Sequence, residues 1–446
     1  MSQYGITLNP RQLVNRWFES YEQFPFIAGG ATLGDKRYIR DALHGDIILP
    51  DEIRRIVDTR SFQRLRYIQQ LATCHYAFPS ATHSRFSHSL GAFHLATRLV
   101  DDLRERFPGK ISDQDARIVP IAALLHDIGH PPFSHMFETP EVFATFADHE
   151  EWGRKILLDN ECDLSNVLRD LLGDGVERLL AIMEGNGVPP FLHEIVSSQL
   201  DVDRFDYLLR DQLVTGTDVG GFDLERLLRA INISEDNRLV VSIYSISAVE
   251  AYLVTRWHMY QLVYFHKLNM LTSVYYVRAL SRARELHESG ALPLSLKMRD
   301  MLSNRDLTPY RYSQLTDSFV IADVFQWADH DDPILSGYAK RLSSRDDFHK
   351  RLRIELNPKQ VEDVWDSLIE LVEESGFDSE HDLIHAPLRK EGYLPYQEGI
   401  HLEDGRDIME ASPLIESISV EFSRSMVFVP LEIRESCEEL VKSILN

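Results

Sequence analysis

The chain has 446 residues, is 44% apolar and carries a formal net charge of −23. It is longer than most single domains and has enough apolar residues for a sizeable buried core. The negative charge argues against a protein that coats nucleic acid nonspecifically, because neutralising phosphates requires clustered Lys and Arg. We therefore do not expect nucleic acid as a partner.

No segment has the composition of a membrane span. The longest uninterrupted apolar run, IVPIAALL at residues 118–125, is far shorter than the roughly 20 residues that a helix needs to cross a bilayer. The N-terminal stretch MSQYGITLNPRQLVNRW contains no apolar signal-peptide core, and the three cysteines are too widely spaced for a disulfide framework. We expect a soluble, cytoplasmic protein with no membrane partner.

Apolar side chains recur at helical spacing in several stretches of the chain. These stretches are residues 51–72, 83–107, 113–130, 191–214 and 246–283. The first is interrupted near Asp58–Thr59, where either residue can cap a new helix. Further along, Asp236–Asn237 separates two β-prone runs and predicts a hairpin.

Beyond about residue 290 the pattern loosens into short helices, acidic turns and a β-prone run near the end. The predicted fold class is mainly α, with a smaller mixed α/β region at the C-terminus. We place an N-terminal extension at residues 1–35, the helical core at 36–285 and the α/β region at 286–446.

Residues 51–90 form an arginine-rich island in this acidic chain. Its members are Arg54, Arg55, Arg60, Arg64, Arg66 and Arg85. Clustered guanidinium groups suit a confined anion site such as a pocket for a nucleoside triphosphate. A solvated helical face explains the same pattern equally well.

The stretch ALLHDIGHPPFSH, residues 123–135, puts His126, Asp127 and His130 into an apolar run. Burying such groups is costly unless they are paired, hydrogen-bonded or bound to a metal. On the segment 191–214, Asp203, Tyr207 and Asp211 are spaced four apart and share one helical face. Imidazoles and carboxylates from separate helices can converge on a divalent metal, but spacing alone does not establish that convergence.

Long sequence blocks resemble the HD-domain phosphohydrolase superfamily and, within it, the deoxynucleoside triphosphate (dNTP) triphosphohydrolases. The blocks are HGDIILP (44–50), FQRLRYIQQLA (62–72), FPSATHSRFSHSLG (78–91), LLHDIGHPPFSHMFE (124–138) and LDVDRFDYLLRD (200–211). They follow the family's order over roughly residues 36–285, while the C-terminal third carries little of the resemblance. The resemblance implies an HD-domain helical core.

The resemblance also implies roles for ionisable residues. The implied metal ligands are His88, His126, Asp127 and Asp203. These donors suit a divalent Mn, Fe, Zn, Ni or Mg ion, and the sequence does not choose among them. His149 matches the family's catalytic histidine, His130 its partner, and Asp211 a carboxylate that positions the substrate.

A further set of positions matches residues that bind the substrate in this family. They are Gln70, Leu71, Arg85, His135, Arg204, Tyr207, Arg256 and Tyr264. The expected reaction is metal-dependent hydrolysis of a dNTP to deoxynucleoside and inorganic triphosphate. The alternatives are an HD phosphohydrolase for nucleoside monophosphates, cyclic dinucleotides or alarmones, and a non-catalytic nucleotide sensor or single-strand nucleic-acid binder.

The last set matches the sites where animal relatives bind activating nucleotides between subunits. It consists of Asp58, Gln63, Arg66, Arg226, His266 and Lys267. The resemblance therefore implies a GTP or dNTP activator and a homo-oligomer, either a dimer or a tetramer. As an alternative, Asp58 caps a helix while Gln63 and Arg66 pair on its surface.

Overall fold

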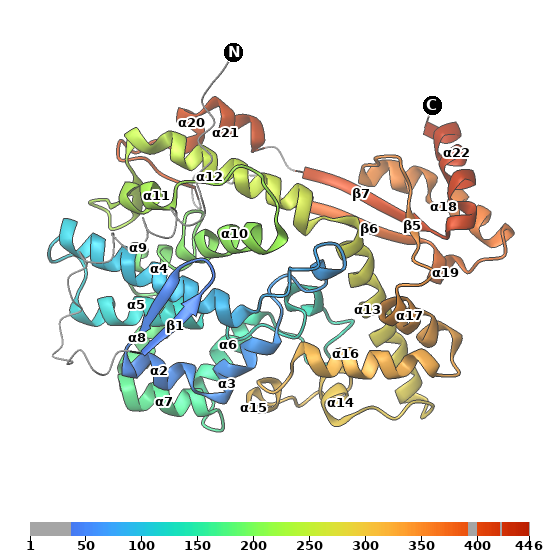
Figure 1. Cartoon of the computed structure of the whole chain (residues 1–446), viewed down its shortest axis with the longest axis horizontal. Helices are drawn as coiled ribbons and strands as arrows, with labels where there is room; N and C mark the ends of the chain where they lie inside the picture. The colour runs from blue at the N-terminus through green and yellow to red at the C-terminus, as the bar shows by residue number, and fades with distance from the viewer. Residues whose placement is uncertain (1–36, 391–398, 420–421, 446) are drawn as a thin grey trace, which may run out of the picture.

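The computed structural model describes residues 37–390, 399–419 and 422–445. The predicted extension 1–35 therefore lies outside the described residues. Helices dominate the fold, and the strands are few and short, apart from one longer antiparallel pair near the C-terminus (Figure 1). The predicted fold class, mainly α with a mixed C-terminal region, is confirmed.

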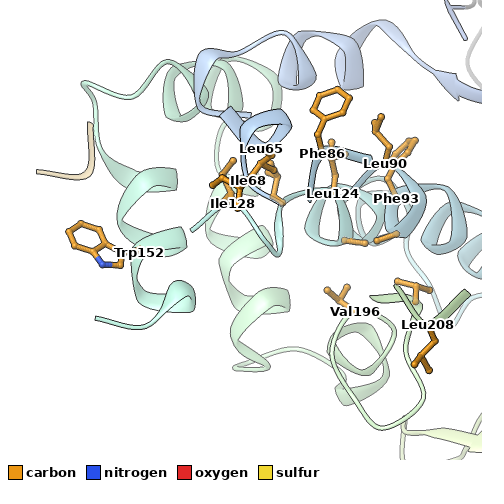
Figure 2. Close-up of a cluster of buried hydrophobic side chains, with 14 of the residues drawn as sticks. Leu65, Ile68, Phe86, Leu90, Phe93, Leu124, Ile128, Trp152, Val196 and Leu208 are labelled. Atoms are coloured by element: carbon orange, nitrogen blue, oxygen red, sulfur yellow. The ribbon is translucent and has the colours of Figure 1, made fainter. Parts of the chain in front are cut away.

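Helices from the first two thirds of the chain surround the predicted site residues. They are α2 (Asp51–Val57), α3 (Arg60–Gln63), α4 (Arg85–Arg106), α5 (Asp113–Leu125), α6 (His149–Leu158), α7 (Asp163–Leu172), α8 (Gly175–Glu184), α9 (Pro190–Glu194), α10 (Val202–Thr215), α11 (Leu224–Ala230), α12 (Ile246–Met259) and α13 (Lys267–Glu288). The long helix α4 packs against both α5 and α10. Figure 2 shows Leu124 of α5 beside Phe86, Leu90 and Phe93 of α4.

The remaining helices follow α13. They are α14 (Leu296–Leu302), α15 (Pro309–Tyr312), α16 (Asp317–Gln326), α17 (Pro333–Ser344), α18 (Pro358–Glu374), α19 (Ser379–Asp382), α20 (Ile408–Ala411), α21 (Pro413–Ile418) and α22 (Arg434–Leu445). The main hydrophobic core runs from Ile47 to Phe428 and includes α14–α17. This core has buried residues on both sides of residue 285. The domain boundary predicted there stays a prediction.

Three small antiparallel sheets complete the described fold. β1 (Arg37–Asp41) pairs with β2 (Gly45–Leu49), and β3 (Ile231–Ile233) pairs with β4 (Leu239–Val241). β7 (Phe422–Val429) lies between β5 (Lys350–Arg351) and β6 (Ile384–Lys390). Together with α18 and α22, which share a second, smaller core with residues of β7, this sheet forms the lobe at the right of Figure 1.

Local capping explains where the predicted helices begin. Thr59 separates α2 from α3, and its hydroxyl accepts the Phe62 amide at 3.3 Å, so the predicted cap is confirmed. The predicted hairpin at residues 236–237 is also confirmed as the β3–β4 turn, where Asn237 takes a left-handed φ of 58°. The hairpin β1–β2 was not predicted from the sequence.

Two predicted helices are each broken in the structure. The stretch 191–214 divides into α9 and α10, because Asp201 caps α10 by accepting the amide of Arg204 at 2.7 Å. The stretch 246–283 divides at a π-turn (Tyr260–Tyr264), after which His266 caps α13. The predicted helix 113–130 ends earlier, at Leu125, and leaves His126 and Asp127 just beyond it.

Candidate functional site: a metal-type centre in a polar cavity

Three of the four predicted metal ligands place their donor atoms within 4.8 Å of one another: His88, His126 and Asp203. The Nε2 atom of His88 lies 3.3 Å from Nε2 of His126 and 3.0 Å from Oδ1 of Asp203. Asp127 borders this group, with its Oδ1 3.2 Å from Nε2 of His126. The ligands come from α4, from the end of α5 and from the first turn of α10.

Hydrogen bonds on the far side of each ring turn the two Nε2 atoms toward the centre. Nδ1 of His126 lies 2.7 Å from the carbonyl of Ala123, which can only accept, so the proton is on Nδ1 and the Nε2 lone pair is free. Nδ1 of His88 lies 2.8 Å from a carboxylate oxygen of Asp206. Both rings are therefore oriented as metal ligands usually are.

Asp206 is a buried carboxylate that connects the centre to the rest of the fold. Its oxygens also contact Nε2 of His44 at 2.6 Å and accept two hydrogen bonds from Arg210, at 2.8 and 2.9 Å. Arg210 in turn donates to Asp41 at 2.8 Å. This network links the hairpin β1–β2 to α10 and fixes the ring of His88 from behind.

Gly91 allows α4 to approach α10 closely enough for this contact. A Cβ atom at Gly91 would lie 1.8 Å from Oδ1 of Asp206, which is much closer than any real contact. A side chain here would therefore displace the carboxylate that orients His88.

The carboxylates around the centre favour a positive charge among the ligand atoms. Burial lowers the pKa of His88, but Asp203 and Asp206 outweigh that effect and raise it to about 10. A divalent ion can supply this charge in place of the proton. The donor set of imidazoles and carboxylates, at separations typical of ligands around one ion, fits such a metal.

A second polar cluster lies beside the centre, and Glu138 is at its middle. One oxygen of Glu138 lies 2.7 Å from Nδ1 of His149, and the other lies 2.8 Å from Nδ1 of His135. His130 stacks on His149 with ring centroids 4.0 Å apart and contacts Asp127 at 3.2 Å through Nε2. The first cluster and the second are therefore joined through His130 and Asp127.

The stacked histidines differ in the direction of their pKa shifts. Burial and the nearby Arg85 guanidinium hold the pKa of His130 well below its usual range. Burial also lowers the pKa of His149, but the Glu138 carboxylate more than offsets this, and the net shift is upward. Two parallel imidazoles in contact do not favour two charges, so a proton on this pair is held at His149 in preference to His130. Of the two rings, His149 is the one suited to act as a general acid.

Both clusters open into one cavity of about 1170 Å³. Every predicted catalytic and substrate-binding residue lines it, as do His126, Asp127 and Asp203, while His88 lies fully buried beneath. The carbonyl oxygen of the Gln70 side chain is buried there and has no hydrogen-bond partner among the residues that the structure describes. The strand β6 closes one side of the cavity with His385, Ala386 and Pro387.

The predicted face of α10 is present as a row of polar groups along the cavity wall. Asp211 is held by Nε2 of His83 at 2.8 Å and by the hydroxyl of Tyr264 at 2.7 Å. One turn earlier, burial holds the pKa of Tyr207 well above its usual range, so its hydroxyl stays neutral. Asp203, Tyr207 and Asp211 therefore point into the same space.

Three of the arginines that line this cavity were predicted to bind the substrate, and a neighbour holds each of them. Arg85 donates to Asp127 at 2.5 Å and to the Ser134 hydroxyl at 2.7 Å. Arg204 contacts Asp201 at 3.2 Å, and Arg256 donates to Gln199 at 2.7 Å. Each is pre-oriented by a neighbour and retains further guanidinium donors for an anion.

The arginine-rich island does not enter the cavity as a whole, so of its two readings the solvated helical face describes most of it. Of its six members only Arg85 lines the cavity. Arg54 pairs with Asp51 and Asp58 on the surface, and Arg55 pairs with Asp170. Arg64 is buried and donates to backbone carbonyls. Structural pairing explains most of this island.

The residues predicted to bind an activator lie away from the cavity, in three places. Gln63 donates to the carbonyl of Val57 at 2.8 Å and accepts from Arg66 at 2.7 Å, next to Asp58 at the end of α2. Arg226 lies on α11 and donates to the carbonyl of Tyr244, while the pair His266–Lys267 lies at the start of α13. Within the described part of the chain, no hydrogen bond or ion pair joins these three places.

Sequence reasoning missed the residues that hold the ligands in place. Glu138 ends a quoted sequence block, and Asp206 lies inside another, three residues after Asp203. That spacing puts both aspartates on neighbouring turns of α10 and is the one signal that could have indicated Asp206. His44 and His83 also lie in quoted blocks, but nothing in the sequence pairs them with partners on α10.

The geometry corresponds to what comparison with known proteins finds. The HD-domain family matches residues 85–211, and the HD-associated region matches residues 222–446. The chain belongs to the HD-domain phosphohydrolases. Among the residues that the structure describes, no helix is both long enough and apolar enough to span a membrane.

The chain is also similar to individual proteins over much of its length. The Bacillus subtilis protein YwfO is 34% identical over 87% of this chain and 90% of its own length. Human deoxynucleoside triphosphate triphosphohydrolase SAMHD1 is 33% identical over 64% of this chain, which spans half of that protein. A phosphohydrolase structure from Bacteroides thetaiotaomicron has a TM-score of 0.75 at 27% identity and covers 89% of this chain and 100% of its own.

Proposed function

We propose that the protein hydrolyses dNTPs to deoxynucleoside and inorganic triphosphate. The observation that carries this proposal is one cavity that combines a metal-type centre, a histidine whose pKa is raised by a neighbouring carboxylate, and several arginines. The similarity to SAMHD1, whose name gives that activity, supports the choice of substrate.

The proposed ligands of the metal are His88, His126, Asp127 and Asp203. A divalent ion bound there would supply Lewis-acid polarisation of the α-phosphate and present water to it. Arg85, Arg204 and Arg256 would hold the triphosphate, with their donors directed at the phosphate oxygens.

The leaving group is the 5′-oxygen of the deoxynucleoside, which needs a proton as its bond to phosphorus breaks. We assign that proton to His149, whose charge is held by Glu138 at 2.7 Å. His130 would hold His149 in place by stacking on its ring, and His135 would contact the same Glu138 from the open side of the cavity.

The sugar would lie between Gln70, Leu71 and Asp211. The apolar Leu71 would face the 2′ position, where a hydroxyl would lose its water without gaining a partner. Asp211, held by Tyr264 and His83, would accept from the 3′-hydroxyl together with Gln70. Ribonucleotides should therefore be poor substrates.

Regulation is the finer part of the proposal. Asp58, Gln63 and Arg66 would bind a guanine nucleotide at a subunit interface, with Arg226, His266 and Lys267 at an adjacent nucleotide site. Asp58 lies in the segment that leads to Gln70 and Leu71, so an occupant there could position the substrate pocket.

The test is incubation of the purified protein with each dNTP and the matching ribonucleotides, with a panel of divalent metals, with and without GTP. Chromatography that resolves tripolyphosphate from pyrophosphate identifies the bond that is cleaved. We expect tripolyphosphate from dNTPs only. Release of orthophosphate from monophosphates, or cleavage of cyclic dinucleotides or alarmones, would assign another HD phosphohydrolase. Binding without turnover under every metal would indicate a nucleotide sensor.

A further inference from the structure

A buried carboxylate from the HD-associated region lies beneath the cavity and binds two loops at once. Oδ2 of Asp317 accepts the backbone amide of Gln69 at 2.8 Å, and Oδ1 accepts the backbone amide of Phe133 at 2.8 Å. Asp317 is 3% exposed and begins α16, more than a hundred residues after either loop. No loop residue lends its own side chain to this contact.

Each of the two amides lies one residue away from a group that faces the cavity. Gln70 follows Gln69, and Ser134 follows Phe133. The Ser134 hydroxyl accepts from Nε of Arg85 at 2.7 Å and donates to the carbonyl of Gln69 at 3.2 Å. The carboxylate therefore connects, through short backbone links, to the side chains of both Gln70 and Arg85.

The loop that carries Ser134 depends on outside support for its conformation. Phe133 and Ser134 have φ values of 55° and 54°, in the left-handed region that side-chain-bearing residues rarely adopt. Such a backbone persists only where surrounding contacts hold it. The hydrogen bond from the Phe133 amide to Asp317 is one such contact, at the first of the two left-handed residues.

The position requires two acceptor oxygens, which an ionised carboxylate provides. Burial raises the pKa of Asp317 to about 6, against the opposing effect of the two amide donors, so the group is charged at neutral pH. Its two oxygens accept one N–H each, and such bonds to a charged acceptor are stronger than neutral ones. An asparagine would turn its NH₂ group toward one of the two amides and lose that bond.

We propose that Asp317 is a positioning residue that sets the placement of Gln70 and Arg85 in the substrate cavity. What the two side chains bind rests on the proposed function, whereas the carboxylate's hold on the two loops does not. Through Asp317 the HD-associated region thus also takes part in substrate recognition from below the cavity, at a residue that does not line it.

The first experiment measures the clamp without any substrate. Hydrogen–deuterium exchange is followed for peptides that contain the amides of Gln69 and Phe133, in the wild type and in Asp317→Asn. The matched control is Asp300→Asn. Asp300 is also a buried aspartate of this region, and the substitution removes its ion pair with Arg311 but touches neither loop. We expect exchange at one or both amides to accelerate on the order of tenfold in Asp317→Asn alone. Unchanged exchange in that variant would overturn the proposal.

The second experiment separates positioning from stability. For Asp317→Asn we expect KM for dATP to rise on the order of tenfold and the preference for dATP over ATP to fall, with bound metal unchanged. Asp300→Asn should keep both values. Wild-type KM and sugar preference in Asp317→Asn would contradict the proposal, since they would leave the carboxylate only a structural role.

A third variant covers the case in which Asp317→Asn does not fold. Ser134→Ala leaves the carboxylate in place but removes the hydroxyl between the clamp and Arg85, and it should also raise KM. A wild-type KM in this variant would refute the route to Arg85. If the wild type itself hydrolyses no dNTP, the proposed function fails, while the exchange measurement still decides whether the clamp exists.

Discussion

At the scale of single residues, the ring of His126 is held by the Ala123 carbonyl and directs its free nitrogen at the centre. We predict that His126→Ala or Asp127→Ala removes the bound metal and abolishes hydrolysis, because each change deletes a donor that the remaining ligands cannot replace. Elemental analysis of the purified variants measures the metal, and nucleotide turnover measures activity.

A matched control is His193→Ala. His193 is also bonded through Nδ1 to a backbone carbonyl, that of Ile182, but does not line the cavity. The His193→Ala variant should keep its metal and its activity. Full turnover by metal-free Asp127→Ala protein would contradict the assignment of the centre.

The pair His149–Glu138 leads to a prediction about pH. Glu138 stabilises the charged form of His149 and raises its pKa, so the acid remains protonated to higher pH. Glu138→Gln removes that effect, which lowers the pKa of His149. The alkaline limb of the kcat–pH profile should therefore move to lower pH, with metal content unchanged.

His149→Ala should reduce kcat by about 10²–10⁴, which is the range of general acid catalysis, and should leave the metal content normal.

The control for Glu138→Gln is Glu141→Gln, which changes an exposed carboxylate in the same segment and should leave the pH profile in place. An alkaline limb that does not move in Glu138→Gln would assign the acid to another group, and His130 would be the next candidate.

Much of the candidate site could be predicted residue by residue, because long sequence blocks carry its ionisable groups. His126, Asp127 and Asp203 do converge, and the cavity gathers the side chains of the substrate set. The supporting contacts could not be predicted. His44 and Asp206 are 162 residues apart in the chain, and no local spacing indicates that they meet.

At the scale of elements, the close approach of α4 and α10 allows Asp206 on α10 to orient His88 on α4. We predict that Gly91→Ala weakens metal binding by about 10–100-fold, because its Cβ would displace the Asp206 carboxylate behind His88. Isothermal titration with Mn²⁺ measures the affinity. The unfolding temperature should also fall.

The control is Gly153→Ala on α6. A Cβ there meets its nearest neighbour, Ile128, at an ordinary distance of 3.5 Å. Alanine favours helix over glycine by about 1 kcal/mol, so this variant should be as stable as the wild type or more stable. Wild-type metal affinity in Gly91→Ala would show that α4 and α10 separate without affecting the centre.

Helical periodicity predicted the positions of the main helices but not their interruptions. Apolar spacing continues through residues 195–201, but α9 ends at Glu194 and a new helix, α10, begins after the N-cap Asp201. The same spacing continues through the π-turn at Tyr260–Tyr264. In both places a cap or a local hydrogen bond outweighs periodicity, and the break brings Arg204 or Tyr264 to the cavity wall.

At the scale of the whole molecule, the proposed activator site makes activity depend on assembly. A triphosphate between subunits stabilises the oligomer by mass action, since it binds the assembled chains and not the separated ones. We predict that GTP or dGTP raises both the molar mass and the rate of the wild type, and that Asp58→Ala and Arg66→Ala lose both effects. Light scattering and turnover at saturating substrate measure them.

Arg54→Ala provides a comparison, because Arg54 contacts Asp58 from the surface but was not predicted to bind nucleotide. It should keep most of the response. Wild-type rates in Asp58→Ala and Arg66→Ala, with no nucleotide effect on mass, would describe a constitutive enzyme in which these residues only stabilise a helix surface.

The cavity wall contributed by β6 has a consequence for how the chain becomes active as it is made. The ligands His88 to Asp203 leave the ribosome well before His385, Ala386 and Pro387 do. At about 5–20 residues per second, the interval is on the order of ten seconds or longer. The proposed ligands are therefore synthesised before this wall of the cavity exists. A chain released early, before β6, would carry all four proposed ligands but lack the strand that closes one side of the cavity.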